Sequence, residues 1–88
     1  MDNKLTVKDF LQVFDFIRSR GERHDHKFQL GDMQAWHDYD GYTCWLGFKD
    51  VTVTLMFHGS LKIDYRKEAS FEEFTQQCLA LNAHKLVH

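Results

Sequence analysis

The spacing of the apolar residues changes twice along the chain, from a helical period to an alternating one and back. Near the N-terminus, apolar residues recur every three or four positions and share one helix face; they are Val7, Phe10, Leu11, Phe14 and Ile17. A second such stripe, near the C-terminus, consists of Phe71, Phe74, Cys78 and Leu81. Between residues 27 and 66, apolar and polar residues alternate, which is typical of half-buried strands. The pattern predicts the order helix, strands, helix.

Residues suited to helix ends delimit both predicted helices. Thr6 is a favoured N-cap residue, and we expect the first helix to end at Gly21. Ser70 and Glu73 have the spacing of a capping box, so the second helix is expected to begin at Ser70 and to run to about residue 84.

Turn-forming residues divide the alternating segment into five expected strands, at about 27–30, 33–39, 42–47, 51–57 and 61–66. Short turns between successive strands predict an antiparallel meander. The pairs expected on its apolar face are Phe28 with Ala35, Ala35 with Leu46, His37 with Cys44, Tyr39 with Tyr42, Val51 with Leu46, Val53 with Cys44, Leu55 with Tyr42, Phe57 with Leu61, Leu55 with Ile63 and Val53 with Tyr65. The last three pairs require a three-residue loop at 58–60.

Two helices side by side are wide enough to cover the apolar face of this sheet. We therefore predict a two-layer α+β fold, a five-stranded antiparallel meander sheet with the N- and C-terminal helices packed on one face. The 88 residues are expected to form one domain over 1–88, because two halves would each be too small to bury a core. The aromatic residues expected in the core are Phe10, Phe14, Phe28, Phe57, Phe71, Phe74, Tyr39, Tyr42 and Tyr65.

The other face of the predicted sheet is left uncovered. One row across it is expected to hold Lys27, Trp36, Trp45, Thr52 and Arg66. Two adjacent Trp rings flanked by cations suit a binding platform. The Trp pair can stabilise its own hairpin, form a self-association surface, or stack on single-stranded nucleic acid. Asp38 and Asp64 in the next row disfavour the last use, because carboxylates repel phosphates.

Phe16 is a second indication of association. It lies roughly 150° around the first helix from the centre of the apolar stripe, where a monomer would expose it to water. Single exposed apolar residues are also common in monomeric proteins, so Phe16 alone does not decide the question. Together with the Trp pair, it makes a homodimer the favoured state.

The segment that joins the first helix to the first strand is basic, and its candidate phosphate ligands are Arg18, Arg20, Arg23 and Lys27. The alternative interpretation is structural, because cations complement the carbonyl groups at a helix C-terminus. The formal net charge of −2 favours neither nucleic acid nor an anionic membrane as a partner.

Catalytic and metal-binding motifs are weak in this chain. His37 and Cys44 could act as base and nucleophile, but both are expected in the covered core. His24 and His26 alternate around an Asp without the spacing of a preformed metal site. We expect no enzymatic activity, no metal and no cofactor, and we expect Cys44 and Cys78 to be reduced.

Two segments, Val13–Arg18 followed by Gly21 and Asp38–Thr43 followed by the meander, resemble a family of short uncharacterised bacterial proteins, one of the domains of unknown function. The resemblance spans nearly the whole chain. It implies a bacterial cytosolic origin and the helix, sheet, helix order, and it implies no activity.

The sequence therefore predicts a small cytoplasmic protein that works by association, as a homodimer or as an adaptor for another protein. Neither a signal peptide nor a membrane-spanning segment is expected. The residues expected to bind a partner are Trp36, Trp45, Lys27, Thr52, Arg66 and Phe16. The alternative is a weak single-stranded nucleic-acid binder that uses the same Trp residues and the basic segment.

Overall fold

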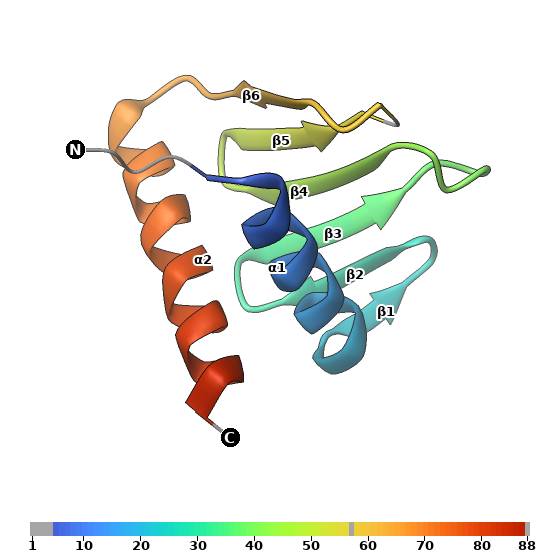
Figure 1. Ribbon diagram of the computed structural model, residues 1–88, viewed down its shortest axis with the longest axis horizontal. Coiled ribbons are helices and arrows are strands. Elements are labelled where there is room, and N and C mark those ends of the chain that lie inside the picture. The colour runs from blue at the N-terminus through green and yellow to red at the C-terminus, as the bar shows by residue number, and fades with distance from the viewer. Residues whose placement is uncertain (1–4, 57, 88) are drawn as a thin grey trace.

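The computed structural model describes residues 5–56 and 58–87, with side chains as far as residue 82. In sequence order, one helix precedes the strands and one follows them, as predicted. The elements are α1 (Val7–Arg20), β1 (Glu22–His24), β2 (Lys27–Leu30), β3 (Met33–His37), β4 (Cys44–Phe48), β5 (Val51–Leu55), β6 (Leu61–Asp64) and α2 (Glu68–Val87). The strands form one antiparallel sheet in sequence order (Figure 1). The α+β meander is thus confirmed, with six strands instead of five.

The additional strand is β1, which pairs with β2. Its three residues are polar and exposed, so they lack the apolar alternation by which a strand is recognised in a sequence. The predicted loop after α1 is therefore a tight hairpin. Asp25, in its turn, has a φ of 61°.

Local signals place α1 as predicted. The Thr6 hydroxyl accepts the Asp9 N–H at 3.1 Å, and the Asp9 carboxylate accepts the Thr6 N–H at 3.2 Å, so a capping box begins the helix. At the other end the Gly21 N–H donates to Ile17 O at 2.7 Å. Leu11 was expected on the buried face but is 48% exposed, whereas Val13 is fully buried.

The predicted start of α2 is wrong by two residues. The helix begins at Glu68, and Asp50, from the turn between β4 and β5, caps it through the two residues that precede it. The Asp50 carboxylate accepts the N–H groups of Arg66 at 2.8 Å and Lys67 at 2.9 Å, and it also accepts a hydrogen bond from the Ser70 side chain. An acceptor distant in sequence thus replaces the local capping box expected at Ser70.

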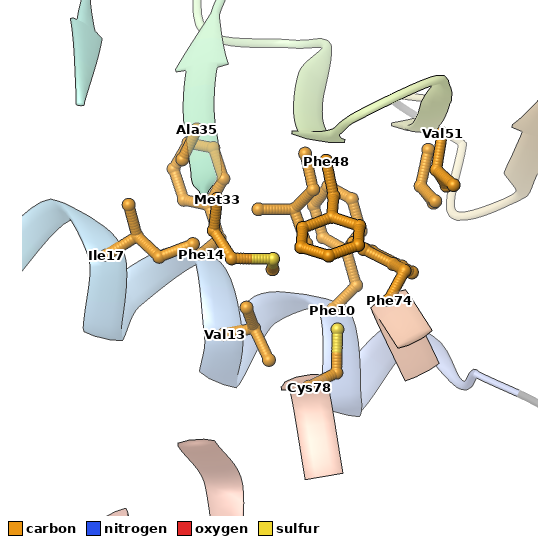
Figure 2. Packing of buried hydrophobic residues seen from close by; sticks show 12 residues of the cluster. Phe10, Val13, Phe14, Ile17, Met33, Ala35, Phe48, Val51, Phe74 and Cys78 are labelled. Carbon is orange, nitrogen blue, oxygen red and sulfur yellow. The ribbon is translucent and has the colours of Figure 1, made fainter. Parts of the chain in front are cut away.

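Both helices pack on one face of the sheet, here called the helical face. Figure 2 shows Phe10 and Val13 of α1 meeting Phe74 and Cys78 of α2 next to β-strand residues such as Phe48. Phe48 was expected in a turn, yet it is 4% exposed and part of this core. The burial of one large aromatic residue stabilises a small domain by about 2–3 kcal/mol.

Several residues predicted in the core lie outside it. β3 ends at His37 and β4 begins at Cys44, so Tyr39 and Tyr42 belong to the intervening turn and are 101% and 68% exposed. His37, the last residue of β3, is also exposed. Tyr65 is 43% exposed and stacks on Phe71. Phe57, another predicted core residue, lies outside the described residues.

The register of the first hairpins is confirmed: Phe28 lies opposite Ala35, Ala35 opposite Leu46, Trp36 opposite Trp45 and His37 opposite Cys44. The later strands are shifted by two residues. Leu46 lies opposite Val53 instead of Val51, and Val53 opposite Ile63 instead of Tyr65. A shift of two leaves every side chain on its predicted face, because side chains alternate with a period of two.

The last hairpin also closes one residue earlier than predicted. The Met56 N–H donates to Ser60 O at 2.9 Å, whereas the predicted loop comprised residues 58–60. Leu61 therefore lies opposite Leu55.

Candidate interaction surface

The face of the sheet opposite the helices, here called the outer face, carries the two Trp residues in a row that crosses the sheet. From β1 to β6 the row reads His24, Lys27, Trp36, Trp45, Thr54 and Lys62. Thr54 and Lys62 take the places expected for Thr52 and Arg66, because of the shifted register. A cation lies on each side of the Trp pair.

Thr52 and Arg66, which were expected in this row, lie elsewhere. Thr52 is on the outer face, in the neighbouring row, opposite Asp64. Arg66 lies after β6, and its backbone N–H is held by Asp50 at 2.8 Å. Arg66 is therefore not a member of the Trp row.

The Trp rings are stacked, with their centroids 5.9 Å apart and an angle of 11° between their planes. Both side chains are half-buried. Lys27 Nζ lies 4.4 Å from the centroid of the Trp36 ring, which is the geometry of a cation–π contact. The Trp36 ring lies close to the backbone of Gly47, since a Cβ on Gly47 would lie 3.1 Å from Trp36 Cζ3. Trp36 thus packs against both Lys27 and the backbone of Gly47, and the pair remains partly exposed.

An open hollow of about 590 Å³ adjoins the Trp pair. It is lined by His26, Trp36, His37, Asp38, Tyr39 and Trp45. The Asp38 backbone and carboxylate hold the turn, since Asp38 N–H donates to Thr43 O at 3.0 Å and Asp38 Oδ1 accepts the Thr43 N–H at 3.3 Å. Sequence reasoning missed this hollow because it placed Tyr39 and His37 in the core. Its aromatic walls and single carboxylate suit an apolar or cationic side chain of a partner.

Phe16 does not join this surface. It belongs to α1, which packs on the helical face of the sheet. Its side chain is half-buried, and Arg20 Cζ lies 5.3 Å from the centroid of its ring. Phe16 was expected to be exposed to water in a monomer, and it is instead half-buried.

The basic residues of the predicted phosphate patch are divided between the two faces. Arg18 and Arg20 lie on α1. Arg23 faces the helical side, opposite Phe28, with its guanidinium 5.9 Å from the centroid of that ring. Lys27 lies on the outer face beside Trp36. The sheet thus separates Lys27 from the three arginines.

His37 and Cys44 are cross-strand partners, as predicted, but the thiol is not activated. Burial, and then the negative charge of Asp38, raise the pKa of Cys44, and Arg18 opposes this only in part. His37 Nδ1 is 2.8 Å from Asp38 O. A second cysteine, Cys78, is buried, which raises its pKa to about 12. Both cysteines are free thiols, and neither has the lowered pKa of a catalytic nucleophile.

Metal-ligating side chains are dispersed. Among residues 5–56 and 58–82, no three His, Cys, Asp or Glu side chains are grouped so as to hold a metal ion. Within the same described chain, neither helix has the length and apolarity needed to cross a membrane.

A family model described as "Protein of unknown function (DUF3081)" matches residues 5–87. The comparisons with curated proteins and with solved structures returned no match. The match covers both helices and all six strands, so it concerns the whole fold described above.

Proposed function

We propose that this chain, which belongs to the DUF3081 family, works by association and not by catalysis. The outer face of the sheet holds a second copy of the chain or a partner protein. The partner's apolar or cationic side chains occupy the hollow beside Trp36 and Trp45, and Lys27 and Lys62 flank the contact.

One observation carries this proposal: the helices leave the outer face uncovered, and two large aromatic rings lie there only half-buried. Trp residues are enriched at the centres of protein interfaces, because a Trp buries a large area and fixes few rotamers. The neighbouring hollow adds concave, mostly aromatic surface. Catalysis has less support, since the pKa of the Cys44 thiol is raised and not lowered.

Fluorescence of the purified protein tests the role of a second copy. The chain contains two Trp residues, and both lie on the outer face, so emission reports on this surface alone. If copies meet there, the emission shifts to shorter wavelength and acrylamide quenching decreases as the protein concentration rises. Dimers that form with unchanged emission would place the contact elsewhere.

A weak single-stranded nucleic-acid binder is the second candidate, because stacked Trp rings between two lysines can accept bases and phosphates. The division of the basic residues and the carboxylate of Asp38 count against it. Titration of the protein with oligo(dT) separates the candidates. Phosphate binding weakens steeply between about 50 and 200 mM salt, whereas aromatic association does not.

A cytoplasmic location is part of the same proposal. Two free thiols, one of them fully buried, are typical of a reducing compartment.

A further inference from the structure

β6 is an edge strand, and it differs from the other edge in chemistry. Figure 1 shows β6 as the outermost strand at the top of the sheet, and in the described part of the chain no strand pairs with its far side. β1, at the opposite edge, is short and entirely polar, which discourages pairing with another chain. β6 instead alternates apolar and charged residues, and Ile63 is 37% exposed. Of the two edges, β6 is therefore the one suited to receive another strand.

The last hairpin determines which backbone groups of β6 face outward. Met56 N–H donates to Ser60 O, so these residues form a hydrogen-bonded pair of the antiparallel ladder. Such pairs alternate with pairs that exchange no hydrogen bonds. Lys62 and Asp64 accordingly turn their backbone groups toward β5. The N–H and C=O of Ile63 point away from β5 and are available to a new strand.

We propose that a second copy of this chain pairs with β6 in antiparallel orientation, about a two-fold axis at Ile63. Ile63 then lies opposite the partner's Ile63 on the helical face and exchanges both backbone hydrogen bonds with it. On the outer face, Lys62 lies opposite the partner's Asp64. The symmetry forms this charge pair twice.

Charge selects this register over its neighbours. A shift of two residues would place Lys62 opposite the partner's Lys62, or Asp64 opposite the partner's Asp64, and like charges directly opposite destabilise a sheet. A shift of one residue would place Ile63 opposite a charged residue on the wrong face. The two-fold axis at Ile63 is the register that pairs apolar with apolar residues and Lys with Asp.

Aromatic packing supports the same register on the helical face. Leu61 would lie next to the partner's Tyr65. The Tyr65 ring is 43% exposed and stacks on Phe71 of α2 with centroids 4.8 Å apart, so it is fixed in position before a partner arrives. Contacts that need no reordering cost less entropy on association.

This inference concerns a second surface and does not depend on the outer-face proposal. Pairing at β6 extends one sheet across two copies and leaves both outer faces on the same side. The Trp pairs of the two copies would then be available together to a partner.

Sedimentation equilibrium of charge variants tests the pairing. Lys62→Asp and Asp64→Lys each place like charges opposite one another at two sites, so dimerisation should weaken about tenfold in either variant. An equimolar mixture of the two variants, or the double variant Lys62→Asp with Asp64→Lys, should restore it. Lys8→Asp, exposed on α1, makes the same charge change outside β6 and serves as the control.

Ile63→Pro provides an independent test. Proline removes the N–H of residue 63, which points away from β5 and would bond only to the partner strand. Circular dichroism should show a folded chain, and sedimentation should show a monomer of 10.5 kDa. Three results would each overturn the pairing. The wild-type protein could be a monomer, the single variants could dimerise like the wild type, or their mixture could fail to restore the dimer. If Trp45→Ser dissociates the dimer while the β6 variants do not, copies meet at the outer face, which contradicts this pairing and supports the proposed function.

Discussion

At the scale of the residue, the outer face depends on the close approach of the Trp36 ring to the backbone of Gly47. A Cβ at residue 47 would lie 3.1 Å from Trp36 Cζ3 and 3.2 Å from Cη2, which is tighter than an ordinary contact. The backbone of Gly47 itself can be adopted by any residue, since its φ is not positive. Gly47 is therefore required for the space it leaves to the ring, and the position of Trp36 in the stacked pair follows from it.

Gly47→Ala should displace the Trp36 ring without unfolding the sheet. Because the ring can move toward solvent, the loss in free energy of unfolding should be small, about 1 kcal/mol. Near-UV circular dichroism and Trp emission should both change. Thr54→Ala, opposite Trp45 on the outer face, is the control. Identical spectra for Gly47→Ala and the wild type would show that the ring does not depend on this residue.

At the scale of the element, the cap of α2 couples the turn between β4 and β5 to the second helix. The Asp50 carboxylate accepts the N–H groups of Arg66 and Lys67, the two residues just before α2. Next to it, Lys49 Nζ lies 2.8 Å from Glu73 Oε1. This ion pair is about half-exposed and contributes little on its own. Asp50 therefore provides the main polar connection at this end of the helix.

Asp50→Asn should lower stability at neutral pH. The Ser70 side chain and the backbone N–H groups of Lys67 and Arg66, just before α2, lower the pKa of Asp50 in the folded state. Its stabilising contribution is therefore fully present above the ordinary carboxyl pKa of about 4 and is lost as the pH falls toward the lower folded value. In thermal unfolding, the difference in Tm between wild type and Asp50→Asn should be largest near pH 7 and shrink in acid. A difference independent of pH would contradict the cap. Asp32→Asn, in an exposed turn, is the control.

The contrast between the two helix starts shows which elements the sequence predicts. Thr6 caps α1 through a residue three positions away, so the signal is local and was found. Asp50 caps α2 across 17 positions of sequence, so the nearby Ser70 was mistaken for the cap. β1 was missed for a related reason, since its stability comes from pairing with β2 and not from an apolar pattern.

At the scale of the whole molecule, the alternation of apolar residues predicted the two faces but not the register of the later strands. Trp36 and Trp45 were found opposite each other because the turn between them is symmetric about Asp40-Gly41. A shift of two residues between the later strands exchanges Thr52 for Thr54 and Arg66 for Lys62 without moving any side chain to the other face. The hollow could not be predicted, because it depends on where β3 ends.

The central claim is that the outer face is the surface by which this chain associates, and site-specific photo-crosslinking tests it most directly. A benzophenone amino acid would replace Thr54, which lies between Trp45 and Lys62 in the row. Ultraviolet light would activate it in cells of the organism from which the chain comes. The matched control carries it at Leu79, which is 54% exposed on α2. We predict a discrete adduct from position 54, either a second copy or one partner protein, and none from position 79. Adducts from position 79 but not from position 54 would contradict the claim.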